Sequence, residues 1–274
     1  MKVYDCFTFF NELDVLLIRL EYLYEYVDYF VVVESSHTHS GKEKPWNFQN
    51  NMKLFEKYLK KIIYIKDLNQ LEQESSFKPA NQFDPKDEFW KLENKQRNAI
   101  LQGLDKAKSN DIIIVSDVDE IPSVNSMKKL KSKLFFNKRI TFIQDLRLYF
   151  INCKATGKEE YWYGSIALKK KNIQNSIQSE RDRRFKNKTL SDGGYHFSYL
   201  GGLDAIITKI ESFAHSEFNK TELKNRDEIM ARIKNGQDIY NRKNYGTSLI
   251  DKNLTRFDPT LDSILTKYPH LFSE

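Results

Sequence analysis

The chain has 274 residues and a formal net charge of +6, but its 44 Lys and Arg residues are interspersed with 38 Asp and Glu residues. This mixture is typical of a solvated surface and argues against a nucleic-acid-binding protein, which needs a clustered basic face. A chain of this length can bury one substantial α/β core, and because no low-complexity segment divides it, we expect one main domain.

The cysteines and the apolar runs restrict the compartment. Cys6 and Cys153 each lie in an apolar, strand-like run, so we expect no disulfide framework and a reducing compartment. Asp5 interrupts the apolar N-terminal run, and nowhere do 18 uncharged apolar residues follow one another. We therefore expect neither a signal peptide nor a membrane span, and a cytoplasmic protein whose modest positive charge is compatible with peripheral contact at the inner face of a membrane.

Strand and helix patterns alternate at the start of the chain. Residues 3–10 and 29–33 are rich in β-branched and aromatic side chains, which is typical of buried strands. Between them, apolar residues recur at steps of three and four over residues 13–27, which predicts a helix. A helical stretch over 52–60 leads to a third strand over 62–65. This alternation favours a sheet that begins with parallel strands.

The pattern breaks at residues 67–90, a polar stretch with two prolines that we expect to form a long loop, either closing over a ligand or remaining a surface excursion. The helical period returns over 90–108, and residues 112–115 form a compact apolar strand. The remaining predicted elements are strands over 140–143, 162–168 and 195–200, a helix over 203–213, and a polar, partly helical extension over 221–274.

Three acidic residues follow the apolar strand at 112–115, namely Asp117, Asp119 and Glu120. Ligands of open α/β sheets bind at the carboxyl ends of strands, so these residues lie where chemistry is expected. Two carboxylates at this spacing can bind Mg²⁺ or Mn²⁺ together with a sugar nucleotide, because phosphate oxygens and water complete the octahedral coordination. The metal would neutralise a leaving diphosphate, with Asp119 as its direct ligand and Asp117 contacting ribose or water.

Other functions fit the same acidic triplet. An acidic turn without a ligand is the simplest of them, and a non-catalytic module that binds a nucleotide or a glycan is another. A strand followed by D-x-D also opens a phosphatase fold, in which the first Asp is the nucleophile. That fold normally begins with this strand, whereas three predicted strands precede it here.

Several stretches of the chain resemble glycosyltransferase family 17 and keep the family's order: YDCFTFFNELDVLLIRL at 4–20, VDYFVVVESSHTHSGKEK at 27–44, QRN at 96–98, SDVDEIP at 116–122, GGYHFSYLGG at 193–202 and KIESFAHSE at 209–217. The resemblance implies a GT-A type, Rossmann-like sheet that binds a nucleotide sugar, an inverting transfer and a UDP-sugar donor, with UDP-GlcNAc favoured. A glycan or a lipid-linked saccharide is the expected acceptor, because no membrane anchor or stem is visible.

We accordingly expect a GT-A catalytic domain over 1–220, with a nucleotide-binding half over 1–122 and an acceptor half over 123–220. Residues 221–274 are expected to form a helical extension that packs on the same domain.

Four residues besides Asp117 are candidates for donor binding. Asn11 and Glu12 leave the first strand at its carboxyl end and Glu34 leaves the second, so all three can face a nucleoside. Helix capping is the alternative role for Asn11. Arg97, near the start of its helix, can reach the diphosphate as a fixed cation, or form an exposed salt bridge instead.

Further candidates come from the second half of the chain. His196 or His215 can add an imidazole to the metal site, and the sequence does not separate them. An inverting transfer needs a carboxylate that accepts the proton of the acceptor hydroxyl. Asp192 is our first choice because the glycine pair that follows it indicates a turn, with Glu217 and Asp145 next.

Aromatic residues make up 14% of the chain, including 15 Tyr and 3 Trp. This is more than a core of this size needs, so some aromatic side chains are expected to line a carbohydrate surface. Tyr149, Trp162 and Tyr163 are the candidates for an acceptor-sugar platform, and core packing is their alternative role.

Overall fold

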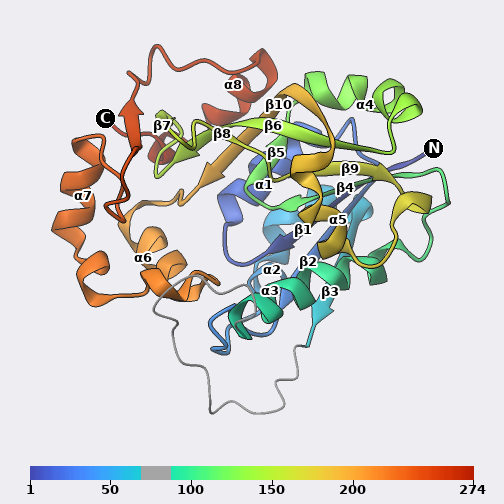
Figure 1. Ribbon diagram of the computed structural model, residues 1–274, viewed down its shortest axis with the longest axis horizontal. Coiled ribbons are helices and arrows are strands. Elements are labelled where there is room, and N and C mark those ends of the chain that lie inside the picture. The colour runs from blue at the N-terminus through green and yellow to red at the C-terminus, as the bar shows by residue number, and fades with distance from the viewer. Residues whose placement is uncertain (69–87) are drawn as a thin grey trace.

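The computed structural model describes residues 1–68 and 88–274, which form a mixed α/β fold with helices on both faces of a sheet (Figure 1). The described strands form an eleven-stranded sheet whose main path runs β11-β7-β6-β9-β4-β1-β2-β3, while β10 pairs with β5 and β6, and β8 pairs with β6. The strands are β1 (Val3–Phe9), β2 (Tyr29–Ser35), β3 (Ile62–Asp67), β4 (Ile112–Asp117), β5 (Glu120–Pro122), β6 (Arg139–Leu148), β7 (Cys153–Gly157), β8 (Tyr161–Trp162), β9 (Ile166–Lys169), β10 (Lys188–Ser198) and β11 (Tyr245–Leu249).

The helices are α1 (Leu13–Leu23), α2 (Asn47–Asn50), α3 (Glu88–Asn98), α4 (Val124–Phe136), α5 (Ile177–Asp182), α6 (Gly202–Ser212), α7 (Arg226–Lys234) and α8 (Pro259–Leu265), with longer 3₁₀ helices η1 (Met52–Lys61) and η2 (Ala99–Leu104). The predicted α/β class is confirmed.

The predicted parallel start of the sheet is also confirmed. β1 pairs in parallel with β2 and β4, and β2 pairs in parallel with β3. β9 runs antiparallel between β4 and β6, so β6 points the same way as β4, and β10 is parallel to β6. The carboxyl ends of these parallel strands therefore meet at one edge of the sheet, which we call the carboxyl edge; the opposite edge is the amino edge.

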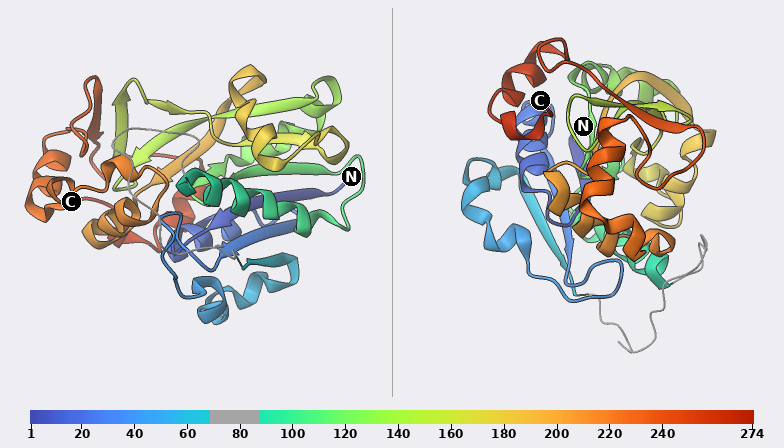
Figure 2. Two further views of the ribbon diagram at one scale, coloured as in Figure 1. Left: turned by 60° about the horizontal axis from the view of Figure 1, so that its bottom comes forward. Right: turned by 90° about the vertical axis from the view of Figure 1, so that its left-hand side faces the viewer.

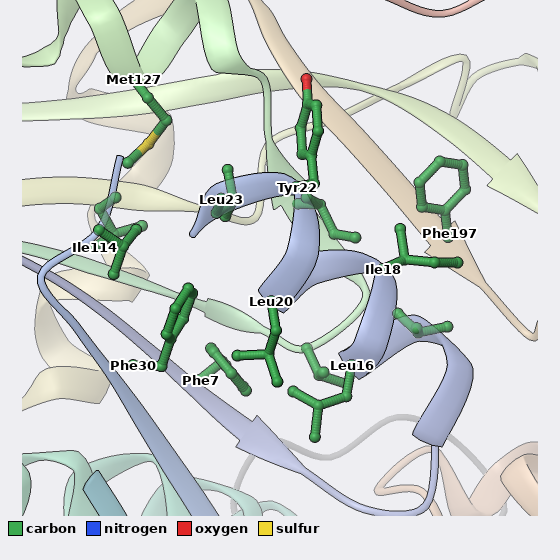
Figure 3. Packing of buried hydrophobic residues seen from close by; sticks show 14 of the residues in the cluster. Phe7, Leu16, Ile18, Leu20, Tyr22, Leu23, Phe30, Ile114, Met127 and Phe197 are labelled. Carbon is green, nitrogen blue, oxygen red and sulfur yellow. The ribbon is translucent and has the colours of Figure 1, made fainter. Parts of the chain in front are cut away.

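The sheet separates two buried clusters because successive side chains of a strand point to opposite faces. Phe7 and Phe30 lie on the face that packs against α1, α4 and α8 (Figure 3). Cys6 and Val31 lie on the other face, against η2 and α5. Since both faces are covered, the central strands can be apolar throughout, as their sequences indicate.

Several elements differ from the sequence-based expectation. The strand expected over 162–168 is two strands, β8 and β9, separated around Gly164. The strand expected over 195–200 begins earlier, at Lys188, and contains an irregularity between Leu190 and Gly194. The helix expected over 52–60 is the 3₁₀ helix η1. The loop expected over 67–90 lies largely outside the described residues.

The C-terminal extension contributes more than helices. Its strand β11 pairs antiparallel with β7 and so lengthens the sheet. Its helix α8 lies beside α1 (Figure 2), and the Tyr22 hydroxyl donates to Asp258, the N-cap residue of α8. Leu261 and Ile264 of α8 belong to the same buried cluster as α1. The extension is therefore joined to the sheet and to the core.

Cys6 and Cys153 are both buried and free. Across residues 1–68 and 88–274, we find no helix with the length and apolar character needed to cross a membrane.

The joined extension predicts cooperative unfolding. Leu261→Ala should lower the free energy of unfolding of the whole protein by about 2–5 kcal/mol, because the fully buried Leu261 packs in the main core. Urea denaturation followed by far-UV circular dichroism measures it. Leu254→Ala, at a side chain that is 72% exposed, is the control and should change stability by less than about 0.5 kcal/mol. Two separate transitions would show that the extension unfolds on its own.

Candidate active site

Asp117, the last residue of β4, lies at the carboxyl edge on the face covered by α3 and α5. Its Oδ1 accepts hydrogen bonds from Arg97 Nη2 (2.9 Å) and from the Thr8 hydroxyl (3.2 Å). Its Oδ2 accepts from Arg181 Nη2 at 2.7 Å. The two arginine side chains are almost fully buried, whereas the Asp117 side chain is 32% exposed. A ligand at this edge would therefore meet the Asp117 carboxylate before it met either guanidinium.

Glu120 is fully buried and holds Arg181 in place. Arg181 donates from Nη1 to Glu120 Oε2 (2.9 Å) and from Nη2 to Glu120 Oε1 (2.6 Å). Trp162 Nε1 also donates to Glu120 Oε1. A side chain at Gly164 has no room here, because a Cβ would lie 1.9 Å from Glu120 Oε1. The break between β8 and β9 thus lets Trp162 and Arg181 meet on one carboxylate.

Asp119 is buried and lies between two groups from the second half of the chain. Lys209 Nζ, from α6, donates to Asp119 Oδ2 at 2.7 Å. His196 Nε2, from β10, lies 3.4 Å from Asp119 Oδ1, and the His196 ring packs on Trp162 with centroids 4.9 Å apart. Lys209 is 24% exposed, and its ammonium is therefore the accessible cation beside Asp119.

The backbone that carries these acids, which we call the acid loop (residues 117–120), is held from beneath by Arg19 of α1. Arg19 is fully buried and forms a two-point ion pair with Asp5 of β1, through Nε (2.8 Å) and Nη2 (2.6 Å). Its Nη2 also donates to the Ser116 hydroxyl. Its Nη1 donates to three backbone carbonyl oxygens, those of Asp117 (3.0 Å), Val118 (3.1 Å) and Glu120 (2.8 Å).

Neighbouring positive charges keep Asp117 and Asp119 ionised. Burial by itself would raise the pKa of Asp117, but Arg181 and Arg97 outweigh it and hold that pKa far below its usual range. Burial would also raise the pKa of Asp119, but Lys209 and His196 outweigh this effect and lower that pKa. The pKa of Lys209 is raised by Asp119 and Glu12 although burial opposes the charge. Asp117, Asp119 and Lys209 are therefore all charged at neutral pH.

The residues predicted on the donor side occupy different environments. Asn11 is exposed after β1, and Glu12 is the N-cap residue of α1 but caps no helical N–H group with its side chain. Glu34 is fully buried. Its carboxylate accepts from groups of one neighbouring segment and of β3, namely Lys44 Nζ, the backbone N–H groups of Asn47 and Phe48, and the Tyr64 hydroxyl. Glu34 thus anchors the segment that follows β2.

The carboxylates predicted as bases are dispersed. Asp192 has φ 53° within β10, its side chain is exposed, and its carbonyl oxygen accepts from Ser123 and Ser126 at the start of α4. It lies four residues before His196, or roughly 13 Å along a strand, on the side away from the carboxyl edge. Asp145 on β6 is paired with Arg147 at 2.6 Å. The structure does not bring Asp192 beside the acid loop.

His215 and Glu217 follow α6, the helix that carries Lys209. His215 Nδ1 lies 2.8 Å from Glu217 Oε1, and the His215 ring packs edge-on against Trp90 of α3, the helix that carries Arg97. Of the two predicted histidines, the structure brings His196, rather than His215, into contact with Asp119.

Within the described residues, no group of three or more His, Cys, Asp and Glu side chains is arranged to hold a metal ion.

The sequence model of glycosyltransferase family 17 matches residues 1–259. The chain belongs to glycosyltransferase family 17. No curated protein matches it. Among solved structures, residues 1–349 of TarS from S. aureus match with 13% identity and a TM-score of 0.40, covering 86% of this chain and 71% of TarS 1–349. The inositol-1-phosphate CTP transferase of T. maritima matches with 10% identity and a TM-score of 0.41, covering 80% of this chain and 96% of that one. At these scores neither likeness assigns a function.

Family 17 membership makes the protein a glycosyltransferase and sets the phosphatase alternative aside. The predicted acceptor aromatics of this glycosyltransferase are not equivalent. Tyr149 is buried in a cluster with α6 and α7, with φ 70°. Trp162 is partly buried between Glu120 and His196, and Tyr163 is partly exposed against Phe185. Trp162 therefore contacts the acid loop through Glu120, whereas the Tyr163 ring packs on Phe185.

Sequence reasoning missed three residues of this candidate site: Arg19, Arg181 and Lys209. Arg19 carried a signal, because it lies on the apolar face of α1 and Asp5 interrupts an apolar strand. Two opposite charges inside buried patterns indicate a buried ion pair. Arg181 and Lys209 approach the acid loop from 64 and 90 residues away in sequence, and nothing local marks them.

Removing Arg19 alone should be strongly destabilising. Arg19→Met leaves the Asp5 carboxylate buried without its partner, so the free energy of unfolding should fall by about 3–5 kcal/mol in urea denaturation. The control is Arg226→Met, at an exposed arginine paired with Asp204, which should cost less than about 1 kcal/mol. An Arg19→Met protein as stable as the control variant would contradict this role.

Proposed function

We propose that this glycosyltransferase is an inverting, metal-dependent enzyme of the GT-A type that passes a sugar from a UDP-sugar to a hydroxyl of a glycan or a lipid-linked saccharide. The favoured donor is UDP-GlcNAc, by the family resemblance, and inversion of an α-linked donor would give a β-linked product. The observation that carries the proposal is the acid loop at the carboxyl edge, where two ionised aspartates lie among Arg97, Arg181 and Lys209.

In this proposal the donor's nucleotide lies over Asp117. Arg97 and Arg181 act through Asp117, because both are buried and each donates to one of its oxygens. Asn11 and Glu12, which leave β1 at the same edge, are the candidates for the nucleoside. Glu34 contributes by fixing the segment after β2, since its carboxylate oxygens are already engaged by Lys44, Tyr64 and two backbone N–H groups.

The residues present fit a divalent cation that is shared with a diphosphate. Asp119 and His196 offer one carboxylate and one imidazole side by side, and His196 Nδ1 is a buried nitrogen without a hydrogen-bond partner in the described part of the chain. Mg²⁺ and Mn²⁺ are commonly held by one or two protein ligands while phosphate oxygens and waters complete the shell. Such a cation would supply charge neutralisation at the leaving diphosphate.

Lys209 gives this site a built-in competitor. Its ammonium already lies on Asp119, so a cation that binds Asp119 must share or displace it. The Lys209 side chain is partly exposed, and a lysine side chain is long and flexible. Once displaced from Asp119, its ammonium can donate to a phosphate oxygen instead. We therefore infer that metal and nucleotide bind together far better than the metal does alone.

Calorimetry of Mn²⁺ and UDP binding tests this inference. In the wild type, UDP affinity should require the divalent ion, and Asp119→Ala should remove the metal-dependent part. Lys209→Met should strengthen Mn²⁺ binding without nucleotide, because its competitor is gone. The same variant should weaken UDP binding in the presence of Mn²⁺ by about tenfold or more, because a charge-assisted hydrogen bond to phosphate is lost.

The matched control is Lys224→Met. Lys224 pairs with Glu211 of α6, the helix that also carries Lys209, and this variant should leave both affinities unchanged. Equal UDP affinity with and without Mn²⁺ in the wild type would refute metal dependence. An unchanged Mn²⁺ affinity in Lys209→Met would refute the competition.

Glu217 is the proposed base, ahead of Asp192. Glu217 follows the helix that supplies Lys209, and its partner His215 contacts the helix that supplies Arg97, so this pair links the two helices that supply these cations. A carboxylate that accepts the proton of the attacking hydroxyl typically contributes about 10²- to 10⁴-fold to the rate. It contributes little to donor affinity.

Paired amide variants separate these two candidates. Glu217→Gln should keep UDP-sugar binding and metal dependence but lose at least about 100-fold in turnover, whereas Asp192→Asn should transfer sugar at nearly the wild-type rate. Turnover with saturating donor and calorimetric donor affinity are the two measurements. The assignment is reversed if Asp192→Asn alone loses turnover, and Glu217 merely orients His215 if its amide variant loses donor binding as well.

A further inference from the structure

The C-terminal end of α4 presents the two most exposed large apolar side chains of the described residues. Phe135 and Phe136 are 76% and 81% exposed, and their rings lie edge to face with centroids 5.0 Å apart. The opposite side of the same helix is buried through Leu130 and Leu134 in the main core. α4 is therefore fixed by its inner face while its last turn projects two aromatic rings into solvent.

Basic residues surround these rings, and acidic residues are missing from the segment. No Asp or Glu occurs in the sequence between Glu120 and Asp145. Over the same stretch the exposed side chains include those of Lys128, Lys129, Lys131, Lys133 and Lys138. Elsewhere the chain mixes the two signs of charge, so this surface is a local concentration of positive charge next to an apolar pair.

A cavity of about 600 Å³ adjoins this surface. It is lined by three lysines, Lys108, Lys131 and Lys169, together with Met1, Asp111 and Phe135 among others. The Asp111 carboxylate accepts the backbone N–H groups of Lys2 and Lys108, each at 2.8 Å, so its charge is already engaged by the backbone. The cavity thus offers ammonium groups at a site where Phe135 supplies an apolar wall.

The cavity and the aromatic pair lie at the amino edge of the sheet. Residues 108–111 immediately precede β4, and Lys169 ends β9, where it pairs with Ile112. Figure 1 shows the N-terminus and the end of α4 on the same side of the molecule. The acid loop follows β4 at its other end, a strand length of roughly 20 Å away. Contact at the amino edge therefore leaves the active site open.

We propose that the end of α4 and the adjoining cavity bind the surface of a membrane that contains anionic phospholipids. Phe135 and Phe136 enter the interface between head groups and acyl chains, and the lysines bind lipid phosphates, Lys108, Lys131 and Lys169 within the cavity. Lysines flanking exposed aromatic rings are typical of segments that bind the membrane interface. A single-stranded nucleic acid would instead need a groove that follows its backbone, whereas these lysines surround the end of one helix.

Vesicle co-sedimentation of the full chain tests the proposal. The wild type should bind vesicles of phosphatidylcholine with 30% phosphatidylglycerol at low ionic strength, should bind pure phosphatidylcholine far less, and should be released by high salt. Phe135→Ser combined with Phe136→Ser should weaken binding by about tenfold or more, and Lys131→Ala by about fivefold. Leu254→Ser and Lys234→Ala, at exposed positions elsewhere, are the matched controls and should bind like the wild type.

Every variant should keep the wild-type melting temperature and UDP affinity, because the surface lies far from the site and the substituted side chains are exposed. Equal binding to neutral and anionic vesicles, or no binding to either, would overturn the proposal. So would unaltered vesicle binding by the double Phe variant. Tight binding to an oligoribonucleotide without vesicle binding would assign the surface to a nucleic acid instead.

Discussion

The ion pair between Arg19 and Asp5 is the constraint on which the active site depends. A buried ion pair of this kind contributes little net stability, because the desolvation of two charges offsets their attraction. Its value here is geometric. Arg19 donates to the carbonyl oxygens of Asp117, Val118 and Glu120, so a helix on one face of the sheet fixes the backbone of the acid loop at the carboxyl edge. An apolar side chain could fill the same volume, but it could not donate hydrogen bonds to the carbonyl oxygens of that loop.

On this fixed loop the acids are balanced by cations of two kinds. Arg97 and Arg181 are buried and reinforced by further acceptors, so they stay with Asp117. Lys209 reaches Asp119 by a partly exposed side chain and can change partner. A ligand that carries both a metal and phosphates would therefore exchange one set of charge pairs for another instead of charging an uncompensated site. Such preorganisation keeps the cost of reorganisation during the reaction low.

The sequence predicted the parallel start of the sheet and the position of the acid loop because both depend on local patterns. Partners of the acids could not be predicted, since Arg181 and Lys209 come from elements that only the tertiary fold brings near. The glycine pair after Asp192 shows a different difficulty. It was interpreted as a turn, yet both glycines lie within β10, where a Cβ on Gly194 would stand 2.1 Å from the Ile121 carbonyl oxygen. These glycines permit close backbone approach, and the strand carries Asp192 away from the site.

The net charge and the composition do not show how charge is distributed over the molecule. A net charge of +6 spread over 274 residues is typical of a solvated surface with both signs of charge, and in the acid loop too the acids are matched by neighbouring cations. The acid-free stretch between Glu120 and Asp145 does not, because its lysines have no acidic neighbours in sequence. The β4 strand separates these two regions, with the lysine-rich surface at the amino edge and the acid loop at the carboxyl edge. A field that is positive at one edge and balanced at the other would orient the enzyme on an anionic surface, with its active site facing the solution that supplies the donor.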